Sequence, residues 1–153
     1  MRDFEKISFK QFAKDVREDK DLYNEYKLPS RDSNKTAGYD FYLIEDLEIK
    51  PNEILKIPTG IKSYYNDDEV LLIVIRSSMG FKYNIRLVNQ IGIIDSDYYN
   101  NKDNEGHIFI KIQNEGKETL KIKKGEAIAQ GIFIKYLTTD TDNNLDIERT
   151  SDY

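Results

Sequence analysis

The sequence RSSMG, residues 76–80, directly follows an apolar stretch and combines a guanidinium, two hydroxyls and a glycine. A guanidinium pairs well with phosphate oxygens, and a glycine can leave backbone amides free to donate hydrogen bonds. Arg76, Ser77, Ser78 and Gly80 therefore predict a cradle for phosphate. Taken alone, Arg76 also fits a charged residue at the end of a strand.

Two more polar side chains stand in apolar surroundings. In TAGYDFYL, Ala37 and Gly38 let the backbone pass closely, and Asp40 lies one residue into an apolar strand. A carboxylate there is costly unless it is paired, hydrated or near a metal ion. In GEAIAQGIF, Gln130 is the one amide in an apolar strand. Taken alone, Asp40 also fits a surface acid near a turn. Gln130, taken alone, also fits a polar residue on an edge strand.

A fourth cluster, IGIIDSDYYNN at residues 91–101, runs from apolar residues into Asp95, Asp97 and two tyrosines. Asp, Ser and Asn bond to nearby backbone in turns, so the stretch by itself favours a strand that ends in a hairpin loop. The role of these side chains depends on the strands and loops that position them.

Composition limits the class of protein. The 153 residues fit a single domain, 1–153, that can bury a core without a structural metal. The absence of cysteine excludes thiolate chemistry and fits a reducing compartment. A net charge of −5 disfavours nucleic acid, so an anionic ligand needs a local cationic spot or a divalent metal. Neither a membrane span nor a signal peptide is evident, so we expect a soluble, cytoplasmic protein.

One helix is predicted, an N-terminal extension over about residues 8–20. Ser8 is its N-cap, Gln11 completes a capping box, and Ile7 and Phe12 have the spacing of a hydrophobic staple. We expect this helix to pack on the outside of a sheet.

After Pro29 the pattern changes to short runs rich in Ile, Val, Tyr, Phe and Leu, separated by turn signals such as PNE and KKGE. Strands are expected at residues 39–44, 47–50, 53–57, 61–65, 69–76, 85–89, 107–113, 119–122 and 127–136. This spacing predicts an all-β sandwich or jelly roll. The tail, about residues 137–153, lacks periodicity and is expected to be mobile.

Together and in this order, the four clusters resemble the motifs of the trimeric dUTPase family: AGxDLxA, RSG/SxxG, NxxGxIDxDY and a GxxIAQ strand. The resemblance covers about residues 37–136, and NQIGIIDSDYY, residues 89–99, is its most specific part. NNKDNEGHI and the leading helix are similar to the branch found in Gram-positive bacteria and their phages. The resemblance implies a dUTPase-like jelly roll, and a homotrimer with shared active sites that uses Mg²⁺ to hydrolyse dUTP, limiting uracil in DNA.

The resemblance also implies roles for the third motif. Asp95 falls at the catalytic base, which would orient and deprotonate a water for in-line attack on the α-phosphorus. Tyr98 falls at the ring that packs on the deoxyribose and leaves no space for a ribose 2′-hydroxyl. Backbone groups of the following hairpin, about residues 99–108, would read the uracil edge, and Asp97 is assigned to hydrogen bonding in that hairpin.

The other motifs are implied to hold the triphosphate and its metal. Asp40 corresponds to an outer-shell ligand that holds a water on a Mg²⁺ ion chelated by the triphosphate. Further substrate contacts are implied for Arg76, Ser77, Ser78, Gly80, Asn89 and Gln130.

The C-terminal end departs from the family, which closes over its substrate with an arm, RxGGFGSTG. Here ERTSDY aligns Arg149 with the arm's arginine and Tyr153 with its phenylalanine, while Ser151 and Asp152 replace two glycines. Either the arm is truncated or diverged, or the tail has no closing function. Because closure excludes water and completes the phosphate clamp, we expect slower turnover than in a relative with a full arm.

Two alternative functions remain open. A dCTP deaminase resembles this family and also carries an RSS motif, but it uses a glutamate in the strand where this chain has Ile110 and Lys111. The other alternative is a dUTPase-like binding protein with weak catalysis that serves a regulatory protein partner. The single histidine, His107, is expected to make a structural hydrogen bond and to take no part in acid–base chemistry.

Overall fold

The computed structural model describes residues 1–142 and 148–151. Its strands are β1 Asp3–Lys6, β2 Tyr39–Tyr42, β3 Leu47–Ile49, β4 Ile54–Pro58, β5 Ile61–Tyr64, β6 Glu69–Ile75, β7 Ile85–Leu87, β8 Gly92–Ile94, β9 Phe109–Asn114, β10 Leu120–Ile122 and β11 Ala127–Lys135. Its helices are α1 Phe9–Asp15, α2 Lys20–Glu25 and α3 Ser77–Tyr83, with a 3₁₀ turn, η1, at Ser96–Tyr98.

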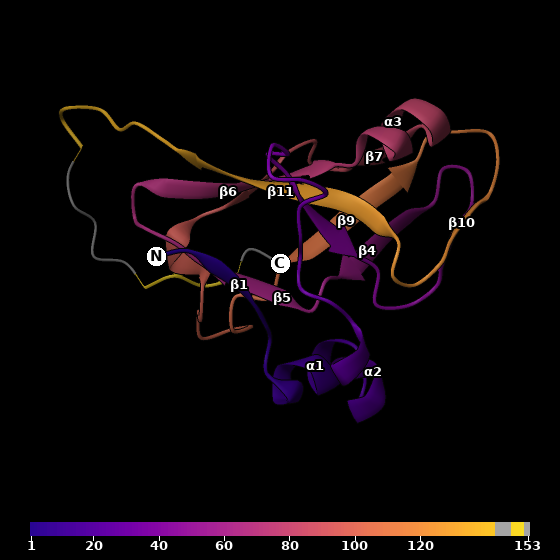
Figure 1. Cartoon of the computed structure of the whole chain (residues 1–153), viewed down its shortest axis with the longest axis horizontal. Helices are drawn as coiled ribbons and strands as arrows, with labels where there is room; N and C mark the ends of the chain where they lie inside the picture. Colours follow the sequence, from indigo (N-terminus) through magenta and orange to yellow (C-terminus); the bar gives the residue numbers. More distant parts are fainter. Residues whose placement is uncertain (143–147, 152–153) are drawn as a thin grey trace.

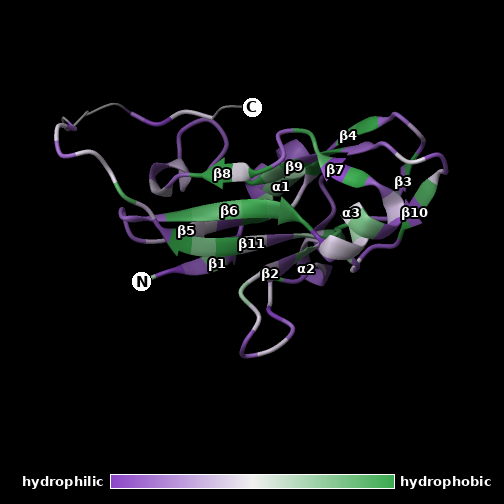
Figure 2. Cartoon of the chain, turned by 90° about the horizontal axis from the view of Figure 1, so that it is seen from above, coloured by the Kyte–Doolittle hydropathy of each residue, from purple (hydrophilic) through white to green (hydrophobic). Residues whose placement is uncertain are grey.

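The strands form antiparallel sheets around one core. A four-stranded sheet has the order β2-β11-β6-β8, a three-stranded sheet the order β4-β9-β7, and β1-β5 and β3-β10 form two pairs (Figure 1). Phe41 and Leu71 from the first sheet share the core with Ile57 and Ile110 from the second. The strands are mostly apolar and the connecting loops mostly polar, as Figure 2 shows. The predicted all-β class is therefore confirmed.

Strand β6 occupies the centre of the larger sheet and pairs with a neighbour along each edge. Ile75 lies opposite Ala129 of β11, and Leu71 lies opposite Ile94 of β8. The chain therefore enters β6 beside the end of β8 and leaves it near the start of β11.

The N-terminal helix begins at the predicted cap. The Ser8 hydroxyl accepts a hydrogen bond from the Gln11 amide at 3.1 Å. The capping box is wrong, because the Ser8 amide donates to the carboxylate of Glu105 and the Gln11 side chain donates to Asp15. The N-terminus of α1 is thus completed by a residue almost a hundred positions away.

The helical content differs from the prediction of one helix over residues 8–20. Helix α1 ends at Asp15, and the side chain of Asp19 accepts from the Leu22 amide at 3.0 Å to start α2. Helix α3 was not expected, because serine and glycine are poor helix formers. It ends at Asn84, whose left-handed backbone (φ 55°) lets its amide bond to the Gly80 carbonyl.

The nine predicted strands are all present, with ends shifted by up to two residues, and β8 is the strand favoured for the stretch at 91–101. Strand β1 was not expected, because DFEK is short and charged, and it is held by pairing with β5. Among the described helices, none has the length and apolar character needed to span a membrane.

His107 makes the expected structural hydrogen bonds. It is fully buried, its Nε2 accepts from the Gly60 amide at 2.9 Å, and its Nδ1 lies 2.6 Å from a carboxylate oxygen of Asp15. Burial lowers the pKa of His107, and this outweighs the opposing effect of Asp15. An accepting Nε2 requires the neutral ring, so the network is built for an uncharged histidine.

This arrangement predicts that stability falls as the solution is acidified. The ordinary pKa of histidine is about 6.5, so just below that pH the unfolded chain binds a proton that the folded chain refuses. The free energy of unfolding should decrease from pH 7 to pH 5.5, with a slope from this residue of at most about 1.4 kcal/mol per pH unit. Urea denaturation at several pH values measures the slope, and His107→Gln should flatten it. An equally steep slope in the variant would assign the effect to other groups.

Candidate active site

A cavity of about 480 Å³ opens between β8 and β9. Three residues predicted to contact substrate line it, namely Asn89, Tyr98 and Arg149. Gly92 and Ile94 of β8 form part of its apolar wall. The cavity thus joins an apolar surface to a few polar groups, as small-molecule sites do.

Tyr98 is held rigidly beside this cavity. Only 3% of the residue is exposed, its hydroxyl donates to the His107 carbonyl at 2.7 Å, and Asn104 Nδ2 donates to the same hydroxyl at 2.8 Å. Because both bonds act on the far end of the side chain, the ring cannot rotate away without breaking them. A flat apolar ring in a fixed orientation suits stacking on a sugar.

The segment after Tyr98, residues 99–107, is a compact loop and contains no strand, so the predicted hairpin is wrong in detail. The Asn100 amide donates to the Glu105 carbonyl, and the Glu105 amide donates to the Asn101 carbonyl, each at 3.0 Å. Gly106 has a φ of +89°, and a Cβ there would lie 2.9 Å from the Asn100 nitrogen. Only glycine fits this turn, which brings the two ends of the loop together.

Asp95 lies at the end of β8 with half of its side chain exposed, so water can reach it. One carboxylate oxygen accepts from Arg149 Nη1 at 3.1 Å, and the same nitrogen lies 3.5 Å from Asp97. Asp97 was expected to bond within the hairpin, whereas its described contact is with Arg149. The guanidinium therefore lies between two carboxylates at the rim of the cavity.

A second cluster brings together residues from the other three motifs. Asp40 of β2 lies opposite Gln130 of β11, and Arg76 Nε lies 3.9 Å from a carboxylate oxygen of Asp40. Burial raises the pKa of Asp40, Arg76 opposes this, and the nearby carboxylate of Asp32 adds to it. A Cβ on Gly38 would lie 1.9 Å from Gln130 Oε1, so the missing side chain makes room for the amide.

The serines of RSSMG lie on α3 and are exposed. Gly80 itself offers no free amide to a phosphate, because its amide donates to the Arg76 carbonyl inside the helix at 3.3 Å. Ser77 and Ser78 are exposed beside Arg76, so their hydroxyls are accessible polar groups at this end of α3.

The two clusters lie at opposite ends of β6. Asp95 follows Ile94, which pairs with Leu71, whereas Arg76 follows the last residue of the strand. Strands rise about 3.3 Å per residue, so positions 70 and 76 are about 20 Å apart. A triphosphate chain is much shorter than this. Within one copy of the chain, Asp95 and Arg76 cannot contact the same triphosphate.

Two lysines in the cavity wall were missed by the sequence analysis. Lys56 of β4 and Lys111 of β9 are direct cross-strand neighbours, and both line the cavity. Like charges in this position repel, so together with Arg149 they favour an anionic occupant. Alternation in β9 could have revealed Lys111, since it lies between the buried Ile110 and Ile112.

Residues 148–151 of the tail contact the loop of their own chain. The Ser151 amide donates to Asp103 at 2.9 Å, and Asn104 donates to the Ser151 hydroxyl at 3.3 Å. Tyr153 and Asp152, which the sequence analysis aligned with the arm, lie outside the described residues. The described part of the tail therefore reaches the cavity rim and places Arg149 there.

The described residues include no group of three or more acidic or histidine side chains that could hold a metal ion. Asp40 and Asp32 nevertheless interact closely enough to raise the pKa of Asp40. Two nearby carboxylates with a single guanidinium leave negative charge that a hydrated cation can offset. Carboxylate oxygens are ligands that Mg²⁺ accepts, often through its bound waters, so this pair has the chemistry to interact with a hydrated Mg²⁺ ion.

The chain is similar to known proteins over most of its length. Residues 24–153 match the model of the dUTPase family. A deoxyuridine 5′-triphosphate nucleotidohydrolase of Lactococcus lactis is 44% identical over 121 residues, which cover 79% of this chain and 81% of that protein. One of the same name from Haemophilus influenzae is 33% identical over 135 residues, covering 86% and 85%.

Solved structures agree with these relatives. A dUTPase from Streptococcus mutans has a TM-score of 0.72 and 39% identity, covering 90% of this chain and 98% of that one. A mutant dUTPase from Staphylococcus aureus phage phi11, described with a structural Mg(II) ion, has a TM-score of 0.71 over 97% of this chain and 99% of that chain. At 18% identity, the second likeness supports the fold alone.

The contact between Gly38 and Gln130 predicts a strongly non-additive pair of substitutions. Gly38→Ala should lower the free energy of unfolding by about 1–3 kcal/mol, because the new methyl displaces the Gln130 amide. In a Gln130→Ala background the same change should cost less than about 1 kcal/mol. Urea denaturation of the four proteins, at one protein concentration, measures the cycle. Equal costs in both backgrounds would contradict the close approach.

Proposed function

The chain belongs to the dUTPase family, and we propose that it hydrolyses dUTP to dUMP and pyrophosphate. The single observation that carries this proposal is that Arg149, which lines the same cavity as the fixed ring of Tyr98, holds the half-exposed carboxylate of Asp95 at the rim of that cavity. The curated relatives bear the name of this activity. The reaction would take place in the cytoplasm, where it would limit the incorporation of uracil into DNA.

Asp95 would act as the general base. It would accept a proton from a water molecule as the water oxygen attacks the α-phosphorus in line and the bond to the α,β-bridging oxygen breaks. The electron pair of that bond leaves with pyrophosphate. Arg149, 3.1 Å from Asp95, would then lie close to the phosphates and stabilise their charge.

Tyr98 and the 99–107 loop would select the nucleoside. The ring packs against a deoxyribose and excludes the 2′-hydroxyl of a ribonucleotide, while backbone groups of the loop read the uracil edge. Cytosine presents the opposite donor and acceptor at that edge and would leave buried groups unpaired, which commonly discriminates by about 10⁴-fold or more.

Arg76, Ser77, Ser78, Asn89 and Gln130 would bind the phosphates, and Gly80 would shape the helix that carries the serines. A bound Mg²⁺ ion would neutralise charge on the triphosphate. Asp40 would hold one of the waters of that ion, which suits its buried position beside Arg76. The sequence of the cluster and the pairing of Asp40 with Gln130 support this assignment.

We further propose a homotrimer with active sites built between subunits. The support is the separation of Asp95 and Arg76 along β6, together with the direction of Arg76, which extends toward Asp40 of β2 and away from β8. If Arg76 comes from a neighbouring subunit, both residues can meet one dUTP molecule. In a closed ring of three identical subunits, every subunit would then supply Asp95 to one site and Arg76 to the next.

The alternatives are less well supported. A deaminase needs an acid in β9, where the chain places Lys111 toward the cavity. A binding protein with weak catalysis was suggested by the altered arm, but Arg149 still reaches Asp95. A regulatory partner would require a surface separate from this site.

Substrate specificity tests the proposal directly. Pyrophosphate release should be fast with dUTP and Mg²⁺, and slower by at least about 10²-fold with dTTP, dCTP or UTP. Asp95→Asn should lower kcat by about 10²–10⁴-fold and change the Kd for dUTP by less than about threefold, because the base acts only in the transition state. Release of ammonia from dCTP would instead establish deamination. An Asp95→Asn variant that keeps its activity would show that Asp95 is not the general base.

Subunit mixing tests the shared site. Asp95→Asn and Arg76→Ala should each be nearly inactive, yet trimers that contain both kinds of subunit should recover activity. In every trimer that contains both kinds of subunit, about one site in three combines an intact Asp95 with an intact Arg76 from a neighbour. Coexpression with two affinity tags isolates the mixed trimers. No recovery in tagged mixed trimers would place both residues of a site in one subunit.

A further inference from the structure

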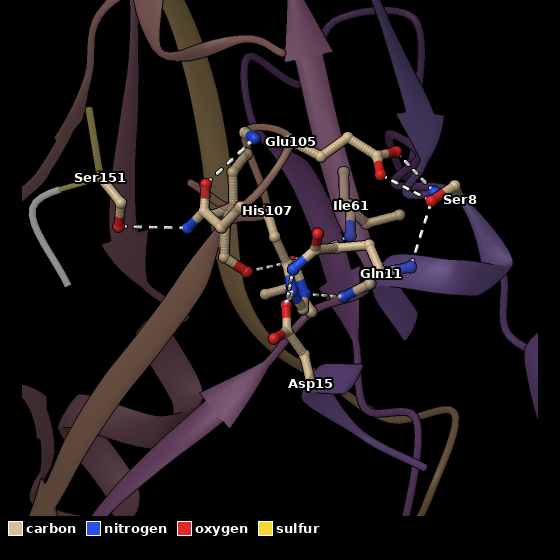
Figure 3. Close-up of polar contacts among 12 residues, drawn as sticks. Ser8, Gln11, Asp15, Ile61, Glu105, His107 and Ser151 are labelled. Atoms are coloured by element: carbon tan, nitrogen blue, oxygen red, sulfur yellow. Dashed lines mark hydrogen bonds and ion pairs between the residues drawn. The ribbon is translucent and has the colours of Figure 1, made fainter. Parts of the chain in front are cut away.

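The N-terminal segment, residues 1–23, precedes the part of the chain that matches the dUTPase family model. It nevertheless contacts the 99–107 loop, which Lys62 of β5 also supports through hydrogen bonds to Asn100 and Glu105. Figure 3 shows Ser8 and Asp15, from opposite ends of α1, pointing toward Glu105 and His107. Two separate contacts therefore join one helix to one loop.

The first contact is made by Glu105. Its carboxylate accepts from the Ser8 amide and the Ser8 hydroxyl, each at 2.6 Å, and from Lys62 Nζ at 3.0 Å. The backbone of Glu105 is left-handed, with a φ of 67°, which is unfavourable for a residue that has a side chain. Three bonds to the side chain hold the residue in this conformation.

The second contact is made by His107. Its ring lies between the Asp15 carboxylate at 2.6 Å and the Gly60 amide at 2.9 Å. The carbonyl of Gly60 in turn accepts from the Ile7 amide at 3.0 Å and the Tyr26 hydroxyl at 2.8 Å. Residues on both sides of α1 thus converge on the end of the loop.

Both contacts lead directly to the ring proposed to bind the sugar. The His107 carbonyl accepts from the Tyr98 hydroxyl at 2.7 Å, and the Glu105 carbonyl accepts from the Asn100 amide at 3.0 Å. A shift of Glu105 or His107 would therefore move Tyr98 and the backbone groups beside it.

We propose that the N-terminal segment is a positioning element of the active site, in which Ser8 acts through Glu105 and Asp15 acts through His107 to hold the 99–107 loop ready for deoxyuridine. This inference rests on the proposed function for the identity of the ligand. The contacts touch no reacting atom, so they act on binding. If the loop spends less time in the competent arrangement, the apparent affinity falls by the same factor.

The Ser8 hydroxyl permits a specific test, because it accepts from the Gln11 amide and donates to Glu105 at the same time. Ser8→Asp keeps a strong N-cap but replaces the donor with a carboxylate that repels Glu105. Adding Glu105→Gln removes the repulsion and supplies an amide donor to the new carboxylate. The two substitutions should therefore compensate each other, which a merely structural defect in α1 would not do.

Ser8→Asp should raise the KM for dUTP by about fivefold or more and leave kcat within about twofold, since a binding loop contributes equally to ground and transition states. The double variant should return KM to within about twofold of the unsubstituted chain. Glu25→Gln is the matched control, because it breaks the ion pair of α2 with Lys124 without touching the loop. Its KM should not change.

Hydrogen exchange of the nucleotide-free protein supplies a readout that does not need activity. The amides of Asn100, Glu105 and Gly106 should exchange about tenfold faster in Ser8→Asp and recover in the double variant. Unchanged exchange and KM in a folded Ser8→Asp variant would overturn the proposal, as would a double variant that is no better than the single one. If Ser8→Asp does not fold, Glu105→Gln alone should raise KM and loop exchange in the same direction.

Failure of the unsubstituted chain to hydrolyse dUTP would refute the proposed function, whereas the exchange data would still decide whether the segment holds the loop.

Discussion

The register of β6 between β11 and β8 decides where each polar cluster of this protein lies. Glycines make that register hard to change. A Cβ on Gly131 would lie 2.9 Å from the ring of Phe41 and 3.0 Å from Leu71, and a Cβ on Gly92 would lie 3.0 Å from Ile73. A slip by one residue would also turn every buried side chain of β6 toward the other face. The separation of Asp95 from Arg76 therefore follows from core packing, and it is the observation on which the proposed intersubunit site rests.

Electrostatics at the site is set locally, against the net charge of the chain. The formal charge is −5, yet Lys56, Lys111 and Arg149 lie in one cavity wall. Charges more than about 8 Å apart are largely screened at physiological ionic strength, so a phosphate inside the cavity responds mainly to its neighbours. The distribution of charge, more than its sum, permits an acidic protein to bind a polyanion.

The sequence predicts the strands well because their information is local. Apolar runs such as EVLLIVI favour a buried strand over other structures. The turn signals between these runs mark the ends of the strands. Helix α3 was missed because its support is tertiary, through the buried Met79 and the left-handed Asn84. The candidate site residues were found through the motif resemblance. The contact of Asp40 with Arg76, the separation along β6 and the wall formed by Lys56 and Lys111 depend on strand pairing that the sequence does not display.

The support of the 99–107 loop illustrates a general limit of motifs. Asn100 and Glu105 both have positive φ, and left-handed residues other than glycine cost about 1–3 kcal/mol each. The motif residues cannot supply that stabilisation alone, because Tyr98 and Asn104 bond mainly to one another and to the loop backbone. Lys62 of β5 and Ser8 and Asp15 of the N-terminal segment contribute it from outside. A motif thus identifies the atoms that meet the substrate, while the energy that holds them in place comes from residues elsewhere in the chain. Two chains with the same third motif can therefore bind the same nucleotide with different affinities.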